Sequence, residues 1–240
     1  MAEAAKLGGN VTGVQMSPKD TKSLLDAVAQ IPPDVPGDSK AIMLERTKRA
    51  EEAERIGSVP VPGSVKGMLK STLDMAMGKS PEILVDKLGE RLAFERNGVR
   101  LYDAVIAKAK ALDAPGSDLL GMLQHIRDEE YEHMLMVAEA IETLGADPTA
   151  MTPCANIAGV KAMGIMEVVT DPRSNLSQAI GALLTAELED NAAWEMLIEL
   201  ADAGGHPKIA KGFEKAKLQE NDHLVKIKTL LRRELINQIK

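Results

Sequence analysis

Two short stretches decide how this sequence folds: "DEEYEHMLM" at residues 128–136 and "QENDHLVKI" at residues 219–227. In each, a glutamate is followed three positions later by a histidine: Glu130 with His133, and Glu220 with His223. Residues three apart on an α-helix lie on one face, so each pair can offer a carboxylate oxygen and an imidazole nitrogen to the same ion. Apolar residues recur around both pairs at the helical spacing, which places the pairs on the face that turns to a core.

The same periodicity predicts four long helices. They are expected at residues 80–112, 117–145 and 175–203, and from residue 207 to near the C-terminus. Short loops join the first to the second and the third to the fourth, so each pair forms an antiparallel hairpin. The segment 146–174 contains three prolines and is expected to cross between the hairpins with one short helix around residues 157–168. The predicted fold is therefore all-α, an antiparallel four-helix bundle with a long crossover between helices two and three.

The first and third helices each carry one glutamate at a core position, Glu95 and Glu187. Each of them precedes the next Glu-x-x-His pair by nearly the same length of chain, which is the pattern of an internal repeat. An aromatic residue follows each glutamate after seven positions, Tyr102 in the first hairpin and Trp194 in the second. Two similar hairpins packed about a pseudo-two-fold axis would bring the polar side chains of all four helices together.

Four buried carboxylates without counter-charge would cost several kcal/mol each, roughly, even after the surroundings relax. Two divalent cations cancel the formal charge of four glutamates. We therefore predict a site for two metal ions, held by these ligands: Glu95, Glu130, His133, Glu187, Glu220 and His223. Oxygen-rich ligation with one imidazole per ion suits iron, manganese or a mixed pair better than structural zinc. The other two histidines, His125 and His206, are expected to lie outside the ligand set.

The four segments "FERNGVRLYD", "DEEYEHMLM", "AELEDNAAW" and "QENDHLVKI" resemble the metal-binding helices of the ferritin-like superfamily, the bacterioferritin and rubrerythrin branch in particular. The resemblance covers about residue 80 to the C-terminus and implies two iron ions bound at the six positions. It implies an oxidoreductase that reacts with dioxygen or hydrogen peroxide, as a ferroxidase or a peroxidase. The chain lacks the four cysteines of a rubredoxin module, so the reductant is expected to be ferrous iron or a separate electron donor.

Two other functions stay open at this stage. One is iron storage in an assembled shell, and the other is a structural bundle whose metal pair is inert. About 80 residues precede the first metal-binding helix, whereas ferritins and bacterioferritins usually begin close to it. We expect a homo-oligomer, and a dimer rather than a shell.

Several residues near the predicted ligands allow two interpretations. Tyr102 is the candidate catalytic residue, as a hydrogen-bond donor at the site or a redox-active group, although a core tyrosine would show the same pattern. Asn191 follows Glu187 by one turn, so it is either a hydrogen-bond partner of a ligand or a residue without a role at the site. Trp194 is interpreted as packing rather than as a residue for electron transfer. Glu129 and Glu132 point away from the core face by about 100° or more on the helical wheel, so both are expected to be surface charges.

The N-terminal third is expected to be separate from the bundle. We predict two domains, an N-terminal arm with short helices at residues 1–79 and the bundle at residues 80–240. Within the arm, helices are expected around residues 22–29 and 39–56. An apolar stripe over residues 65–77, rich in methionine, should lie against the bundle or a neighbouring subunit.

Composition excludes several classes of function. The net charge of −7 gives no attraction to a phosphate backbone, so nucleic acid is not an expected partner. Cys154 is the single cysteine, which rules out an intrachain disulfide and cysteine-rich metal sites. No apolar run reaches the roughly 20 residues of a membrane span, and the first residues lack the pattern of a secretory signal. A cytoplasmic protein without a membrane partner is expected.

Overall fold

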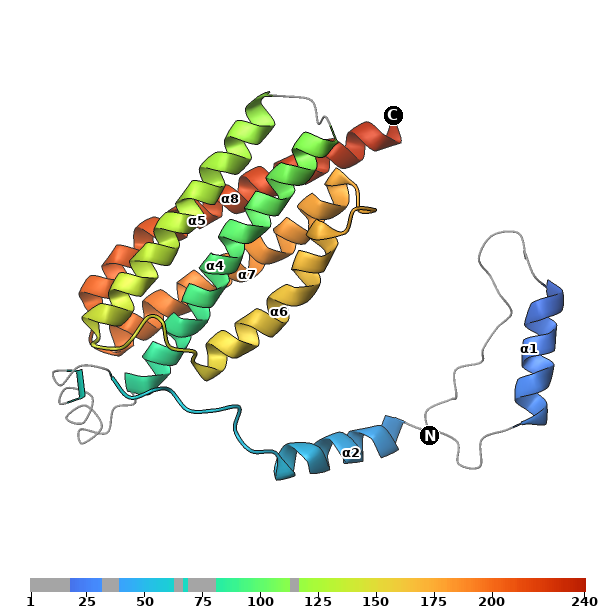
Figure 1. Cartoon of the computed structure of the whole chain (residues 1–240), viewed down its shortest axis with the longest axis horizontal. Coiled ribbons are helices and arrows are strands. Elements are labelled where there is room, and N and C mark those ends of the chain that lie inside the picture. Colours follow the sequence, from blue (N-terminus) through green and yellow to red (C-terminus); the bar gives the residue numbers. More distant parts are fainter. Residues whose placement is uncertain (1–17, 32–38, 63–66, 69–80, 113–116) are drawn as a thin grey trace. The chain divides into compact units, whose positions relative to one another are not determined.

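The computed structural model describes residues 18–31, 39–62, 67–68, 81–112 and 117–240, and it divides the chain into two units, residues 1–55 and 56–240 (Figure 1). The first unit contains α1 (Pro18–Gln30) and α2 (Ser39–Glu52), near the two positions expected from the sequence. Most of the stripe at residues 65–77 lies outside the described residues. The predicted boundary at residues 79–80 and the docking of the arm stay predictions.

The second unit is a bundle of long helices. Its four main helices are α4 (Pro81–Ala111), α5 (Ser117–Thr143), α7 (Leu176–Ala203) and α8 (Pro207–Ile239). Helix α4 packs against α5 and α7, and α8 packs against α7 and α5, so two hairpins lie side by side (Figure 1). The described residues include no strand. The all-helical bundle predicted from the sequence is confirmed.

The crossover between the hairpins differs from the short helix that was predicted at residues 157–168. Helix α6 (Pro153–Thr170) is 18 residues long and packs along α4 and α7. It begins earlier because Thr152 Oγ1 accepts a hydrogen bond from the amide of Ala155 and Pro153 suits the first turn. A carboxylate of α4 fixes the same end, since Asp86 Oδ1 accepts a hydrogen bond of 2.8 Å from the amide of Cys154.

Local signals also set the ends of the second hairpin. Asn175 and Gln178 form a reciprocal capping box at the start of α7. Between α7 and α8 the chain turns at Gly205, which has a φ of 81° that residues with a side chain rarely adopt. Among the helices of the described residues, none is long and apolar enough to cross a membrane.

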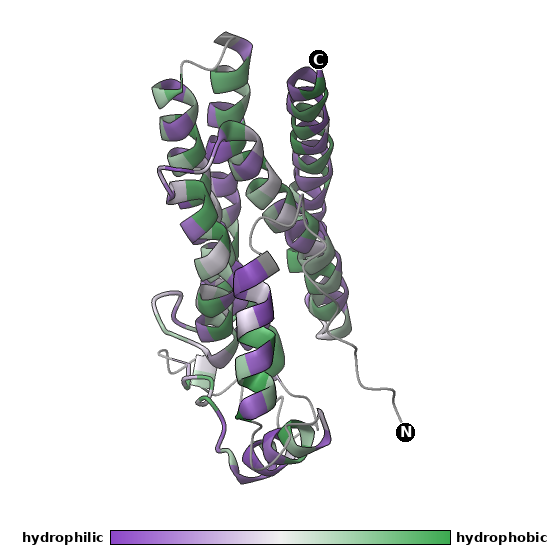
Figure 2. Cartoon of the chain, turned by 90° about the vertical axis from the view of Figure 1, so that its right-hand side faces the viewer, coloured by the Kyte–Doolittle hydropathy of each residue, from purple (hydrophilic) through white to green (hydrophobic). Residues whose placement is uncertain are grey.

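Apolar and polar residues alternate along the helices (Figure 2), and the buried apolar residues form two clusters. Helices α4, α5, α7 and α8 contribute to both clusters, whereas α6 contributes to one. One contains Tyr102, Leu123, Ile126, Ile180 and Ile227, among others. The other contains Leu88, Val137, Trp194, Leu197 and Phe213, among others. On α5, α7 and α8 the predicted ligands fall in the sequence interval between the two clusters. The polar residues therefore occupy a layer that is closed off by apolar side chains on both sides.

The buried face of α7 departs from the predicted stripe. The helical spacing around Glu187 predicts a core stripe that includes Leu184, Asn191 and Ile198, but these three residues are only partly buried. Leu183 and Asp190 are buried in their place. Helix α7 contacts α4, α6 and α8, so its buried surface is wider than the single stripe of a helix that faces one core.

Candidate metal centre

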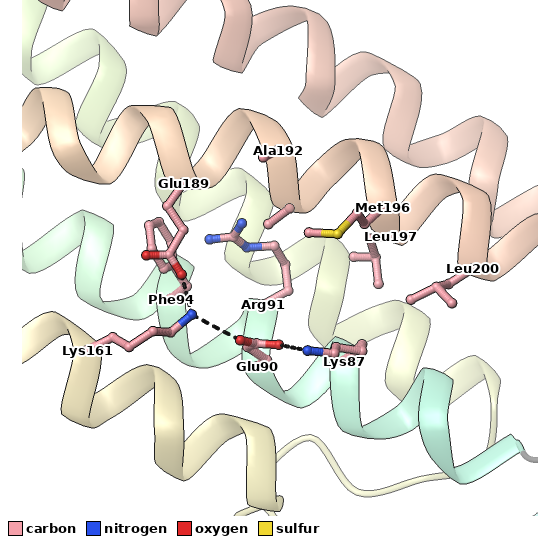
Figure 3. Close-up of a pocket in the computed structure, with 11 residues that line it drawn as sticks. Lys87, Glu90, Arg91, Phe94, Lys161, Glu189, Ala192, Met196, Leu197 and Leu200 are labelled. Carbon is pink, nitrogen blue, oxygen red and sulfur yellow. Dashed lines mark hydrogen bonds and ion pairs between the residues drawn. The ribbon is translucent and has the colours of Figure 1, made fainter. Parts of the chain in front are cut away.

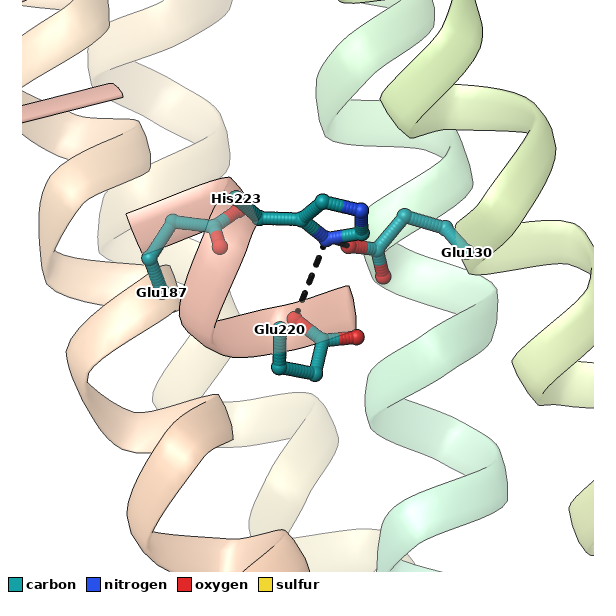
Figure 4. Close-up of side chains that lie close together, drawn as sticks. All are labelled: Glu130, Glu187, Glu220 and His223. Atoms are coloured by element: carbon teal, nitrogen blue, oxygen red, sulfur yellow. Dashed lines mark hydrogen bonds and ion pairs between the residues drawn. The ribbon is translucent and has the colours of Figure 1, made fainter. Parts of the chain in front are cut away.

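The six residues predicted as ligands come together in the middle of the bundle. Each of them is at most 2% exposed, although all six carry ionisable groups. Ligand atoms of Glu130, Glu187, Glu220 and His223 lie within 4.8 Å of one another (Figure 4). A second set of atoms that meets the same limit comes from Glu95, His133 and Glu220. Glu220 belongs to both sets and so lies between them.

Both imidazoles turn the same nitrogen toward the carboxylates. His133 Nδ1 lies 2.6 Å from Glu220 Oε1 and 3.9 Å from Glu95 Oε2. His223 Nδ1 lies 3.2 Å from Glu220 Oε2 and 3.5 Å from Glu130 Oε1. The two oxygens of Glu220 thus face one imidazole each, which is the arrangement expected of a carboxylate that bridges two ions.

The outer nitrogens of the imidazoles contact two residues, Gln219 and Glu129. His223 Nε2 lies 2.8 Å from Glu129 Oε2, and His133 Nε2 lies 3.2 Å from Gln219 Oε1. Gln219 donates its amide N–H to Glu129, so its carbonyl oxygen must accept from His133. Each imidazole then donates its Nε2 proton to its outer partner, so that Nδ1 can bind a cation once it has released its own proton to solvent.

The position of Glu129 corrects the sequence-based interpretation. It was expected to be a surface charge, but its side chain is only 15% exposed and contacts His223. A glutamate has enough reach to turn back from the flank of α5 toward α8, which a helical wheel does not represent. Glu132 is exposed, as expected, and lies 3.7 Å from Lys215. His125, which was expected to lie outside the ligand set, is 61% exposed and lies 3.5 Å from Glu129.

A buried ion pair beside the ligands was not anticipated. Arg91 Nε lies 2.8 Å from Glu95 Oε1, and Arg91 Nη1 lies 2.8 Å from Asp190 Oδ1. Arg91 and Asp190 are 3% and 2% exposed. Burial alone would lower the pKa of Arg91, but Asp190 and Glu95 raise it, so the guanidinium stays charged. The spacing could have revealed both residues, because Arg91 lies one turn before Glu95 and Asp190 three residues after Glu187.

Arg91 also lines a cavity of about 320 Å³ between α4, α6 and α7 (Figure 3). Leu197, Met196 and Leu200 supply apolar wall, while Lys161 and Glu90 form an ion pair of 3.2 Å at the rim. A single side chain therefore contacts both this cavity and the carboxylate of Glu95.

Burial dominates the protonation of the carboxylates when no cation is bound. It raises the pKa of Glu95, Glu130 and Asp190 well above the usual range and that of Glu187 to about 8. Glu220 is the exception: burial alone would raise its pKa, but hydrogen bonds from the two imidazoles lower it to about 2. Most of the acids would therefore hold protons at neutral pH unless other cations neutralised them.

Several ligand oxygens have no hydrogen-bond donor. Glu95 Oε2, Glu130 Oε2 and Glu187 Oε2 are fully buried and accept no hydrogen bond from the described residues. Buried polar atoms are nearly always paired, and unpaired ones require an explanation such as an ion. Carboxylate oxygens together with imidazole nitrogens are ligands that iron and manganese accept. The donor set therefore fits a pair of metal ions.

The three residues with two interpretations are now placed. The hydroxyl of Tyr102 donates to Glu187 Oε1 at 2.5 Å, so the residue contacts a predicted ligand. Asn191 donates to the backbone carbonyls of Glu187 and Glu220, both at 3.0 Å, and so joins α7 to α8 without contacting a ligand carboxylate. Trp194 packs edge-on against the imidazole of His133, with ring centres 5.6 Å apart, in agreement with a packing role.

One glycine makes room for a predicted ligand. A Cβ atom at Gly98 would overlap Glu130 Oε2 and lie 3.1 Å from its Cδ. The substitution Gly98→Ala is therefore expected to displace the carboxylate of Glu130 and to weaken metal binding about ten-fold or more. Titration of the metal-free protein with Mn²⁺ measures the change.

The matched control is Gly121→Ala on α5, where an added Cβ meets no atom within 4 Å. This variant should bind metal as the parent does and should be more stable by up to about 1 kcal/mol, because alanine favours the helix. Equal metal affinity in the Gly98 and Gly121 variants would show that the contact with Glu130 does not matter.

Comparison with known proteins identifies the family of this chain. A search of curated proteins found no match. Among solved structures, the chain is similar to one described as a crystal structure of ferritin-like, diiron-carboxylate proteins from Bacillus anthracis str. Ames. That match has 21% identity and a TM-score of 0.48, and it covers 62% of this chain and 94% of the other. The family model described as ferritin-like domain matches residues 85–236, more than half of the chain. The chain therefore belongs to the ferritin-like domain family.

Proposed function

We propose that this protein is an oxidoreductase whose bundle holds two iron ions and reduces dioxygen or hydrogen peroxide. The observation that carries the proposal is the charge balance of the buried layer. Among the described residues, the buried acids are Glu95, Glu130, Glu187, Asp190 and Glu220. Within the part of the chain that the structure describes, Arg91 is the one buried side chain with a permanent positive charge. Two divalent cations bring the formal charge of these groups to zero. One cation or none would leave a net negative charge in a region of low dielectric.

The proposed ligand roles follow from which atoms lie close together. Glu95 and His133 would hold one ion and Glu187 and His223 the other, while Glu130 and Glu220, which lie near both groups, would contribute to both positions. The bridging role of Glu220 is supported by its two oxygens, which face different imidazoles at 2.6 and 3.2 Å. Manganese or a mixed pair would satisfy the same ligands.

The chemistry divides between the ions and the protein. When bound, a ferrous pair supplies two electrons, which with two protons reduce hydrogen peroxide to two waters or dioxygen to hydrogen peroxide. The side chains orient the ligands and keep water out. Burial and the charge of Glu187 raise the pKa of Tyr102 well above its usual value, so this residue stays a neutral donor that holds Glu187 in place. The apolar clusters above and below the polar layer limit the access of water.

Rapid mixing of the anaerobic, ferrous protein with each oxidant tests the proposal. Oxidation of two ferrous ions per chain should follow addition of hydrogen peroxide or dioxygen, and the faster of the two reactions distinguishes a peroxidase from a ferroxidase. A ferrous pair that reacts with neither oxidant faster than free ferrous iron would contradict the proposed function.

A neighbouring pair of glutamates on α5 provides a matched test of the ligands. The substitution Glu130→Ala removes a proposed bridge and should lower the metal content from two ions per chain to one or none. The control Glu132→Ala removes an exposed carboxylate two residues away and should leave both ions bound. Elemental analysis of both purified proteins measures the difference, and two ions in the Glu130 variant would show that the ligand assignment is wrong.

A further inference from the structure

Two residues in equivalent positions differ in charge. Glu129 and Gln219 each come directly before the glutamate of a Glu-x-x-His pair. Each reaches across to the histidine of the other helix, Glu129 to His223 and Gln219 to His133. The pseudo-symmetry of the bundle therefore places a carboxylate behind one imidazole and a neutral amide behind the other.

This difference changes how strongly each imidazole donates to a metal ion. A carboxylate that accepts the Nε2 proton makes a charge-assisted hydrogen bond and increases the electron density on Nδ1. An amide oxygen does so less. The distances agree, at 2.8 Å for His223 to Glu129 and 3.2 Å for His133 to Gln219. Gln219 cannot reverse its amide without turning an oxygen toward the carboxylate of Glu129, so the arrangement is fixed.

The carboxylates beside the two imidazoles also differ, in a way that favours tighter metal binding beside His223. Glu95, beside His133, already shares its charge with the guanidinium of Arg91 at 2.8 Å. Glu187, beside His223, accepts only a hydrogen bond from the neutral hydroxyl of Tyr102. Asp190 balances much of the charge of Arg91, at 2.8 Å from Nη1, but Arg91 Nε still pairs with one oxygen of Glu95. A cation at the His133 position therefore competes with the guanidinium for Glu95, whereas no arginine or lysine of the described residues forms an ion pair with Glu187.

We propose that the two metal positions have different affinities: the one at Glu187 and His223 fills first and holds its ion tightly, and the one at Glu95 and His133 fills second and exchanges its ion. This inference rests on the proposed function, because it requires that two ions bind at the six residues. The centre is then an asymmetric pair with one resident ion and one replaceable ion.

Calorimetric titration of the metal-free protein with Co²⁺, without oxidant, tests the inference. Two binding steps are expected, with dissociation constants that differ about 10- to 100-fold, the range found when an outer partner of a metal ligand is changed. His133→Ala should abolish the weak step and leave the tight one. His223→Ala should leave only weak binding. Two equal steps in the unchanged protein would overturn the inference, and no binding at all would instead overturn the proposed function.

Exchange of the two outer residues identifies the cause. Glu129→Gln alone should weaken the tight step about 10-fold or more, whereas the exposed control Glu132→Gln should change neither step. Combining Glu129→Gln with Gln219→Glu places the carboxylate behind His133 and the amide behind His223. In this double variant the two dissociation constants should move closer together, or the position at His133 should fill first. Steps that remain unchanged in the Glu129 variant would refute the role given to this residue.

A measurement on the unchanged chain covers the case in which a histidine variant does not fold. Crystals of the protein with one equivalent of Co²⁺ should show an anomalous peak beside His223 and little density beside His133. Equal peaks at both positions, or a stronger peak beside His133, would overturn the inference.

Discussion

The substitution Arg91→Met is expected to lower the free energy of unfolding by about 3–5 kcal/mol, the loss typical when one partner of a buried ion pair is removed. Arg91 contacts Glu95 and Asp190 at 2.8 Å, and all three side chains are buried. Without the guanidinium, both carboxylates lose their cation in an environment that water cannot reach. Urea denaturation of the metal-loaded protein measures the change.

The same chain offers both a control substitution and a second substitution that should recover part of the lost stability. Arg96→Met replaces an exposed arginine on the same helix and should cost less than about 1 kcal/mol. Adding Asp190→Asn to Arg91→Met removes the stranded charge and should recover part of the loss. If the Arg91 variant were as stable as the Arg96 variant, the buried charge balance would not be what holds this layer together.

Raising the pH from about 6 to about 9 is expected to destabilise the metal-free protein steeply. Burial raises the pKa of Glu187 from 4.5 to about 8 and that of Glu95, Glu130 and Asp190 well above the usual range. In this interval the folded chain holds protons that the unfolded chain has lost, so stability falls as pH rises. For Glu187 the fall is about 1.4 kcal/mol per pH unit until the pH reaches its folded pKa of about 8, and the other three carboxylates act in the same direction.

The two remaining shifted groups do not reverse this trend. The carboxylates of Glu130 and Glu220 raise the pKa of His223 to about 12, although burial alone would lower it, so its contribution is also lost as pH rises. The lowered pKa of Glu220, about 2, contributes stability above its unfolded value of 4.5 that is lost only as pH falls toward 2. Neither group therefore offsets the loss between pH 6 and 9.

Metal ions should remove most of this dependence, because they replace the protons on the carboxylates. The melting temperature of the metal-loaded protein is expected to vary little over the same interval. The increase in melting temperature on adding metal should therefore grow with pH, and metal binding should release protons. Scanning calorimetry with a chelator and with metal measures both curves. A metal-free protein whose melting temperature is constant or rises from pH 6 to 9 would contradict the assignment of buried, protonated carboxylates.

The four long helices and the six central residues could be predicted because they depend on spacing within single helices. A glutamate and a histidine three residues apart share a face in any α-helix, and the apolar residues around them show which face is buried. Antiparallel pairing followed from the short loops alone. None of these inferences required knowledge of which helices touch.

The residues that were missed depend on contacts between helices. The spacing places Arg91 and Asp190 near the ligands on their own helices, but their burial and their pairing depend on the contact between α4 and α7, which one sequence does not reveal. Glu129 turns from the flank of α5 to His223 on α8, a contact that depends on side-chain reach. The extent of α6 was underestimated because Thr152 and Asp86, which fix its first turn, meet only in the folded chain.

Anomalous diffraction from crystals of the iron-loaded protein, recorded at the iron absorption edge, shows whether two ions bind in the buried polar layer. We expect two peaks in the middle of the bundle, both bounded by Glu130 and Glu220, with one beside His133 and the other beside His223. A bundle without iron in this layer, or iron bound only at exposed carboxylates, would contradict this expectation.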